Sequence, residues 1–159
     1  TYTNANGGNI AIASNHLVAT QQGQVRTTTF GNGTAGSITL NLRDRLILSD
    51  PGTGLFANTA TESRGSGGNL FATAPQACIQ AGAGIAVDTQ GAGPGGTIQL
   101  QVGQLTMASQ GFITAATTST GNAGDIQVMG QNLLLTDPGT TIRSGSGTAQ
   151  QRGAVTGTG

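Results

Sequence analysis

The chain has no lysine and no tryptophan, and only 8% of its 159 residues are charged. Six arginines balance six acidic residues, so we expect neither a basic surface for nucleic acid nor a polybasic patch for an anionic membrane. The single cysteine, Cys78, excludes an internal disulfide and a cysteine-based zinc cage. No run of residues approaches the roughly 20 apolar positions that a membrane-spanning helix needs. The composition therefore predicts no nucleic-acid partner and no membrane insertion.

Glycine, in contrast, is abundant, and many of the 28 glycines recur with a fixed period. A triplet of Gly, any residue, and Ile or Leu begins at positions 8, 36, 68, 96 and 124, so successive triplets are 28, 32, 28 and 28 residues apart. Two positions after the Ile or Leu there is a second, mostly aliphatic residue: Ile12, Leu40, Ala72, Leu100 or Val128. This alternation is typical of a strand with one buried face.

Two further strands are expected in each repeat. In the second, the inward positions are Leu17 and Ala19, Leu46 and Leu48, Ala77 and Ile79, Leu105 and Met107, and Leu133 and Leu135. The third begins at Val25, Leu55, Ile85, Ile113 and Ile142, and it ends in a hydroxyl ladder of Thr29, Thr59, Thr89, Thr117 and Ser146. A turn is predicted between these strands, with Asp-Pro-Gly at 50–52 and 137–139 and with a glycine of positive φ at 23, 52, 111 and 139.

Three short strands and three corners in 28 residues describe one coil of a parallel β-solenoid. We predict a single right-handed parallel β-helix over residues 1–159, with five coils starting near residues 8, 36, 68, 96 and 124 and partial coils at both ends. Gly and Pro interrupt every window in which a helix of about 12 residues could form. Of the four extra residues in the second coil, we expect one before Leu46 and three after the third strand begins, bulging near 61–66 and carrying Glu62 and Arg64 outward.

Two segments carry a resemblance to a known family. GNGTAGSITLNLRDRLILSDPGTGLFANT and STGNAGDIQVMGQNLLLTDPGTTIRS resemble the repeat domains of filamentous-haemagglutinin-like large exoproteins, which are secreted by the two-partner route. The resemblance covers about residues 7–147 and rests on the Gly-Asn-Ala-Gly turn, the Leu-x-Leu strand and the Asp-Pro-Gly corner. It implies a right-handed β-helix that is exported across an outer membrane, with adhesion, aggregation or delivery of a toxic tip as its role. Since neither the secretion-domain signature nor a toxin-like domain is recognisable, we expect a structural or adhesive shaft.

No cluster of residues in the sequence predicts catalysis, a cofactor or a metal ion. Asp50 and Asp137 occupy the same corner but lie three coils apart, which is too far for a pair of catalytic carboxylates. Asp125, in the stretch GNAGDIQV, is expected to be a turn residue that accepts backbone N–H groups. His16 is expected to have no acidic neighbour. Cys78 is expected to be an outward-facing, inert thiol.

One surface feature is a candidate interface. The outward positions of the second strand are mostly apolar, and this outer stripe comprises Val18, Ile47, Cys78, Thr106 and Leu134. We predict that the outer stripe packs against another copy or a terminal segment, because contiguous exposed apolar surface often marks an interface. Neither end resembles a cap, so two explanations stay open: the chain stacks end to end, or it is part of a longer shaft. Gly153, 29 residues after Gly124, resembles the start of a sixth coil.

Two other functions are kept as alternatives. A right-handed solenoid is also a scaffold for binding or cleaving carbohydrate, which would gather acidic or basic side chains along one groove. The hydroxyl ladder suggests an ice-binding face, but its residues have the same strand parity as Val25 and Ile85, so its hydroxyls are expected to face inward or to cap a corner. The expected partners of an adhesive shaft are a surface glycan, a protein receptor or a second copy. Its expected location is the cell surface or the extracellular space.

Overall fold

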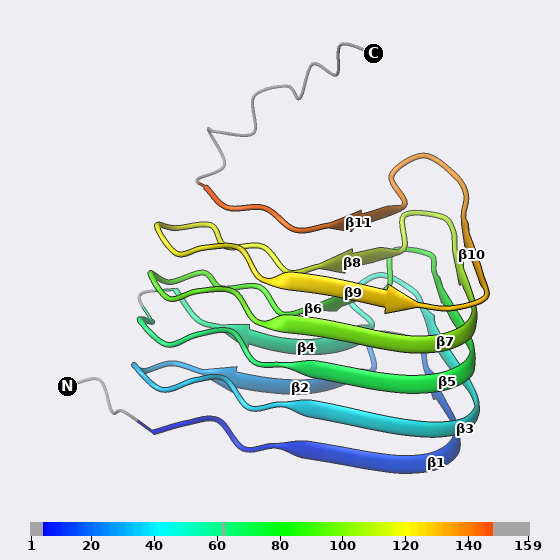
Figure 1. Ribbon diagram of the computed structural model, residues 1–159, viewed down its shortest axis with the longest axis horizontal. Coiled ribbons are helices and arrows are strands. Elements are labelled where there is room, and N and C mark those ends of the chain that lie inside the picture. The colour runs from blue at the N-terminus through cyan, green and yellow to red at the C-terminus, as the bar shows by residue number, and fades with distance from the viewer. Residues whose placement is uncertain (1–4, 62, 148–159) are drawn as a thin grey trace.

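The computed structural model describes residues 5–61 and 63–147, and all regular structure in these residues is β-strand. In Figure 1 the chain runs toward the right along the front, returns at the back and rises by one level, which makes a right-handed solenoid. The front sheet contains β1 (Ile10–Ala19), β3 (Ile38–Ser49), β5 (Leu70–Gln80), β7 (Thr97–Met107), β9 (Asp125–Met129) and β10 (Asn132–Leu135). The back sheet contains β2 (Gln24–Thr29), β4 (Gly54–Thr59), β6 (Gly84–Ala86), β8 (Phe112–Thr114) and β11 (Thr141–Arg143). The predicted β-helix of about five coils is confirmed.

The strands pair in parallel, in the register that the repeat predicts. In the front sheet one column is formed by Ile10, Ile38, Leu70, Ile98 and Ile126, and in the back sheet another is formed by Val25, Leu55, Ile85, Ile113 and Ile142. The hydroxyl ladder is aligned as well, with bridges from Thr59 to Thr89, from Thr89 to Thr117 and from Thr117 to Ser146. Its four threonines are at most 4% exposed, so the hydroxyls face inward as expected.

The number of strands differs from the prediction in one respect. In the first four coils the first and second expected strands form one continuous strand, and only in the fifth coil are they separate, as β9 and β10. On the two lowest long strands the corner carries a register irregularity, between Ser14 and His16 on β1 and between Asn41 and Arg45 on β3. Both irregularities come from the one additional residue of β3, which forms a β-bulge, whereas β5 and β7 pass the corner without a register shift.

The four extra residues of the second coil are distributed differently from the prediction. One lies before Leu46, as expected, where two residues of β3 face one residue of β1. A second lies in the Asp-Pro-Gly turn at 50–52, which is one residue longer than the equivalent turn of the third coil. Only the remaining two follow Thr59, so the expectation of three was wrong. Arg64 is exposed in this segment as predicted, and Glu62 lies outside the described residues.

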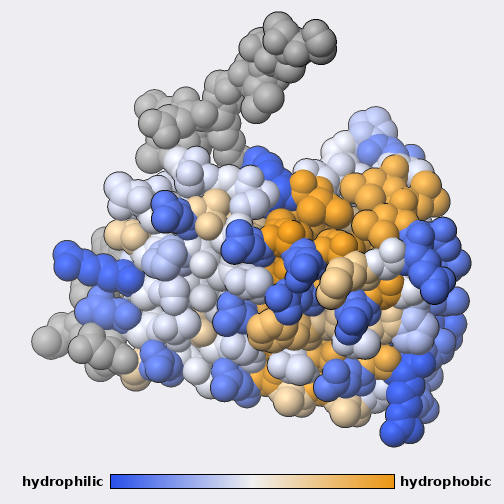
Figure 2. Space-filling model, in the orientation of Figure 1, coloured by the Kyte–Doolittle hydropathy of each residue, from blue (hydrophilic) through white to orange (hydrophobic). Residues whose placement is uncertain are grey.

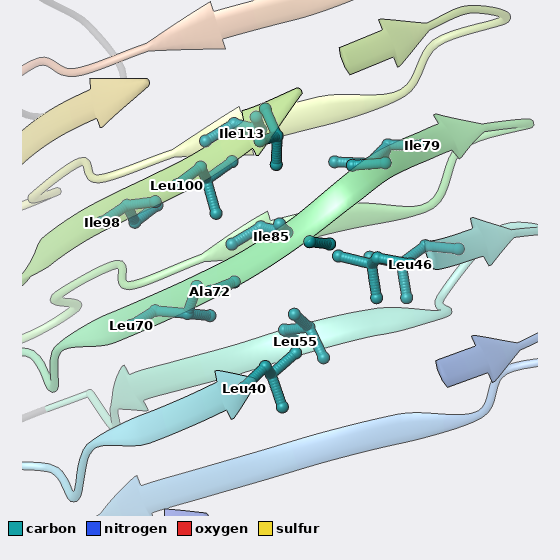
Figure 3. Packing of buried hydrophobic residues seen from close by; sticks show 14 of the residues in the cluster. Leu40, Leu46, Leu55, Leu70, Ala72, Ile79, Ile85, Ile98, Leu100 and Ile113 are labelled. Carbon is teal, nitrogen blue, oxygen red and sulfur yellow. The ribbon is translucent and has the colours of Figure 1, made fainter. Parts of the chain in front are cut away.

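Aliphatic side chains from both sheets fill the interior. Figure 3 shows Leu100 of β7 facing the back sheet beside Ile113 of β8, and Leu40 of β3 facing Leu55 of β4. These four side chains are at most 1% exposed. Removing a Leu or Ile side chain from water contributes about 1.5–3 kcal/mol, so the stacked columns hold the coils together. In the first and fifth coils the same columns are only partly buried, because within residues 5–61 and 63–147 each of these coils has a neighbouring coil on one side alone.

The glycine that starts each coil is required by close packing between coils. A Cβ atom at Gly36, Gly68, Gly96 or Gly124 would overlap the carbonyl oxygen of the equivalent glycine in the coil below. Only a residue without a side chain allows the two backbones to approach this closely. A Cβ atom at Gly8, in contrast, would meet nothing within 4 Å, because no described coil lies below it. We call these five residues the corner glycine column.

Two kinds of turn connect the front sheet to the back sheet. The Asp-Pro-Gly turns of the second and fifth coils are of type II, with a φ of 79° at Gly52 and 84° at Gly139. The other three coils use two consecutive left-handed residues, which are Gln21 and Gln22, Ala81 and Gly82, and Ser109 and Gln110. This is the type I′ pattern, which has a positive φ at both central residues.

The predicted positive φ is therefore wrong for Gly23 and Gly111. Each follows a left-handed pair and closes the turn by donating its N–H to a carbonyl three residues earlier, Thr20 and Ala108 respectively, at 2.9 Å. A Cβ atom at Gly111 would overlap the carbonyl oxygen of Ile79, so a residue with a side chain would not fit against the coil below. The four glycines each lie six residues after the first inward Leu of the second strand, at 17, 46, 105 and 133, and this count ignores the additional residue of the Asp-Pro-Gly turns.

Candidate functional site

Several acidic side chains bind the backbone of an adjacent coil. The Oδ2 atom of Asp50 accepts a hydrogen bond from the N–H of Gln21 at 2.8 Å, and Oδ2 of Asp137 accepts one from the N–H of Ser109 at 3.1 Å. Both bonds join an Asp-Pro-Gly turn to the left-handed turn of the coil below. Asp88 accepts from the N–H of Ala116 in the coil above, at 2.8 Å. These three carboxylates therefore act as connectors between coils.

Asp125 occupies a position that binds the coil above in two other repeats. The Oδ1 atom of Asn9 accepts from the N–H of Ser37 at 2.8 Å, and Oδ1 of Asn69 accepts from the N–H of Thr97 at 3.1 Å. Asp125 is paired with Thr97 and is the equivalent residue of the fifth coil. Its side chain is exposed and has no hydrogen-bond partner within residues 5–61 and 63–147.

His16 has an acidic neighbour, contrary to the prediction. Its Nδ1 atom lies 3.9 Å from Oδ2 of Asp44, which also lies 3.7 Å from Nε of Arg45. Asp44 belongs to the corner where β3 has one residue more than β1, and a simple count of the repeat misplaces it. All three side chains are about half exposed. An exposed ion pair of this kind contributes little to stability.

Cys78 lies on the outward face of β5 and is partly buried, as the strand parity predicts. Burial raises the pKa of its thiol, so the thiolate is disfavoured. Its Sγ atom lies 3.6 Å from Oε1 of Gln80. Arg45 and Ile47 line the same shallow hollow as Cys78. A cysteine in this state is a poor nucleophile.

The outer stripe is a real column of the front sheet, since Val18 pairs with Ile47, Ile47 with Cys78, Cys78 with Thr106 and Thr106 with Leu134. Val18 and Leu134, at its two ends, are 57% and 55% exposed, whereas Ile47 and Cys78 are half-buried. In Figure 2 hydrophobic surface gathers over the right-hand half and is most extensive toward the end of the solenoid that carries β9 and β10. The stripe is therefore available to a partner.

A groove of about 400 Å³ runs across the outer face of the back sheet in the lower coils. Its wall includes Arg26, Phe30, Phe56, Asn58, Thr61 and Gln90. Phe30 is 70% exposed, and the ring of Phe56 lies over Gly54, where a Cβ atom would be 2.8 Å from Cζ. Arg26 pairs with Phe56 on the adjacent strand, and its Nε donates to Oγ1 of Thr28 at 2.9 Å. The groove thus combines aromatic surface with guanidinium, amide and hydroxyl groups.

The two ends of the described solenoid expose apolar side chains and strand edges. At the upper end Leu133, Leu134 and Leu135 of β10 and Met129 of β9 are 42–55% exposed. At the lower end β1 and β2 each pair on one side only, with β3 and β4. Such edges carry unpaired N–H and C=O groups and readily accept another strand.

The described part of the chain contains no group of three or more His, Cys, Asp or Glu side chains placed to hold a metal ion. It also contains no helix long and apolar enough to cross a membrane. The outward positions of the strand that ends in the hydroxyl ladder form the row Arg26, Phe56, Ala86, Thr114 and Arg143, in which Ala86 is only 3% exposed. This row has none of the regularity that an ice-binding lattice would need.

The groove is the feature that the sequence reasoning missed. Arg26 and Phe56 are paired on neighbouring strands, and this adjacency could have been found from the repeat alone. Phe30 and Gln90 lie beyond the ends of their strands, so no strand parity could assign them to the same surface.

Compared with known proteins, the chain matches no family model, no curated protein and no solved structure. The fold itself, a right-handed parallel β-solenoid whose adjacent coils are connected by acidic side chains, is therefore the basis for the proposals below.

Proposed function

We propose that the chain is a structural and adhesive shaft segment of an exported protein, located at the cell surface or in the extracellular space. The observation that carries this proposal is the stacking of equivalent apolar residues and glycines through all five coils. Backbone ladders, apolar columns and the corner glycine column all run along one axis. A structure of this kind resists bending and displays side chains at fixed intervals, which suits it to hold a tip or to make many weak contacts.

The distribution of the polar side chains supports a mechanical role. Asp50, Asp88 and Asp137 connect adjacent coils instead of converging on one point. The amides of Asn58 and Asn69 do the same, by accepting from the N–H groups of Asp88 and Thr97. Three of the five described acidic side chains, Asp50, Asp88 and Asp137, therefore stabilise the stack of coils.

The location is tested by immunogold electron microscopy of cells of the source organism, intact and permeabilised. Antibodies raised against the purified chain should label the outside of intact cells or filaments released from them. Labelling that requires permeabilisation would overturn the proposal. Blocking of adhesion by the same antibodies would distinguish an adhesive shaft from a purely structural one.

A second function, carbohydrate binding, is favoured by the groove on the back sheet. The apolar face of a sugar ring stacks on aromatic side chains, and its hydroxyls bind guanidinium and amide groups. Arg26, Phe30, Phe56 and Gln90 supply both kinds of group within one hollow. This function is compatible with the first, since a shaft that binds glycan is an adhesive shaft.

A further inference from the structure

We infer that the two ends of the solenoid are complementary, and that the fifth coil of one copy binds the first coil of a second copy. The partner is a second molecule of this chain, stacked head to tail so that Gly8 of one copy lies on Gly124 of the other. This inference rests on the proposed shaft function and names its assembly contact.

The corner glycine column provides the first argument. Four of its members are glycines because a side chain would overlap the coil below. Gly8 has the same place in the repeat, yet a Cβ atom there would meet nothing within 4 Å. Its φ also lies outside the left-handed region that favours glycine. A glycine at this position is explained if another coil lies beneath it, and in the proposed stack the carbonyl oxygen of Gly124 of a second copy makes this contact.

The second argument is that the junction would repeat a contact already present within the chain. The fifth coil has the longer Asp-Pro-Gly turn and the first has the two-residue turn. The same succession occurs where the third coil lies on the second, and there the strands pair in register on both sides of the turn. The corner spacing also matches, because only the second coil has an additional residue before its second strand segment. No new backbone geometry is required.

The exposed groups at the two ends provide the third argument. Stacking would place the column residues Ile126, Val128 and Ile142, which are now partly buried, against Ile10, Ile12 and Val25 of the second copy. It would also place an N–H donor, that of Asn9, above the carboxylate of Asp125. The equivalent donors Ser37 and Thr97 bind the asparagine below them in the chain itself.

One residue of the first coil departs from this complementarity. Gly33, Gly65, Gly93 and Gly121 form a second glycine column, in which each Cβ atom would overlap a carbonyl oxygen in the coil below. The first coil has Ala5 in this column, and a Cβ atom at Gly33 would overlap its carbonyl oxygen. The methyl group of Ala5 would therefore press on Gly121 of the other copy, and the loop that carries Ala5 must move for the stack to form. This departure weakens the contact and supplies one of its tests.

Disulfide trapping between two cysteine variants tests the inference directly. In a Cys78→Ser background, Ala11→Cys is mixed with Gln127→Cys at high concentration under mild oxidation. These exposed positions belong to one register column, so stacking would bring their Cα atoms to about 4.8 Å, within the range of a disulfide. The matched control mixes Ala13→Cys with Gln127→Cys, whose Cα atoms would be about 8 Å apart, beyond disulfide reach.

The in-register pair should give at least about tenfold more dimer than the out-of-register pair. Equal yields, or no dimer from either mixture, would overturn the inference. A lack of dimer because residues 148–159 cover the fifth coil would count against the inference in the same way. Gly8→Ala, added to the Ala11→Cys protein, should abolish the dimer without lowering the melting temperature, and Ala5→Gly should raise the yield. A Gly8→Ala protein that still forms the dimer would contradict the stacking geometry. Surface labelling of cells is independent of these yields, so failure here leaves the shaft proposal standing.

Discussion

The carboxylate of Asp50 holds the backbone N–H of Gln21 at 2.8 Å across two adjacent coils. Gln21 has a φ of 53°, in the left-handed region, and its N–H is not used within its own turn. In the same turn the N–H of Gln22 donates to Oγ1 of Thr53 at 2.9 Å. One Asp-Pro-Gly-Thr segment therefore satisfies two consecutive donors of the turn below it. The corner motif thus has a function in stacking as well as in turning the chain.

We expect Asp50→Ala to lower the free energy of unfolding by about 1 kcal/mol, because the N–H of Gln21 loses its acceptor. Alanine also tolerates the φ of 84° at this position less well than aspartate does. Asp50→Asn is the matched control, since asparagine keeps an oxygen acceptor and accepts a left-handed backbone. Urea denaturation followed by circular dichroism measures both. A loss as large in Asp50→Asn as in Asp50→Ala would show that the negative charge, and not the acceptor, is what matters.

The corner glycine column leads to a second prediction. Gly96→Ala should lower the free energy of unfolding by about 1–3 kcal/mol, because the methyl group overlaps the carbonyl oxygen of Gly68 and the two backbones must separate. Gly145→Ala is the control: a Cβ atom there meets nothing within 4 Å, so the change should stay within about 0.5 kcal/mol. Thermal unfolding of both variants checks the difference. Comparable melting temperatures would mean that the coils can separate at this corner at little cost.

Much of the fold follows from the sequence because a parallel solenoid translates a repeat directly into contacts. Residues one period apart become neighbours, so the columns headed by Ile10 and Val25 and the inward hydroxyl ladder were predicted correctly. The same rule failed wherever the period is not constant. Asp44 lies beside His16 because β3 has an additional residue at its corner. The additional residue at 50–52 means that Gly52 and Gly23 are not equivalent, although a count from the repeat aligns them.

The candidate site was less predictable for a different physical reason. Strand parity tells which face a side chain occupies, but a groove also depends on where loops end and on how aromatic rings lie. The ring of Phe56 covers Gly54, and Phe30 projects from the end of β2. Neither orientation is encoded in the period.

The thiol of Cys78 provides a third prediction. Burial raises its pKa, so at a given pH it should carry less thiolate than the same cysteine in the unfolded chain. Its second-order rate of reaction with iodoacetamide should therefore be lower in buffer than in urea. The midpoint of the pH profile between pH 7 and 10 should also lie higher in the native protein. A native midpoint below that of the unfolded chain would indicate that Arg45, which lines the same hollow, dominates over burial.

The groove provides the last prediction. If it binds glycan, isothermal titration with linear hexasaccharides of glucose, N-acetylglucosamine and galacturonate should detect at least one ligand, and Phe30→Ala should weaken its binding about tenfold. Phe30 is 70% exposed, so its removal leaves the core unchanged. Arg26→Ala should have a similar effect through the loss of its donors.

Arg143→Ala is the matched control for the arginine, because Arg143 occupies the same outward row as Arg26 in the fifth coil, away from the groove. Its loss should leave the affinity unchanged, since the two residues share an environment on the sheet but not the hollow beside Phe56. An equal loss in both arginine variants would indicate attraction by the general charge of the back sheet and not a defined site. Binding to none of the three hexasaccharides would remove the support for carbohydrate binding, whereas the shaft would stand on its stacking alone.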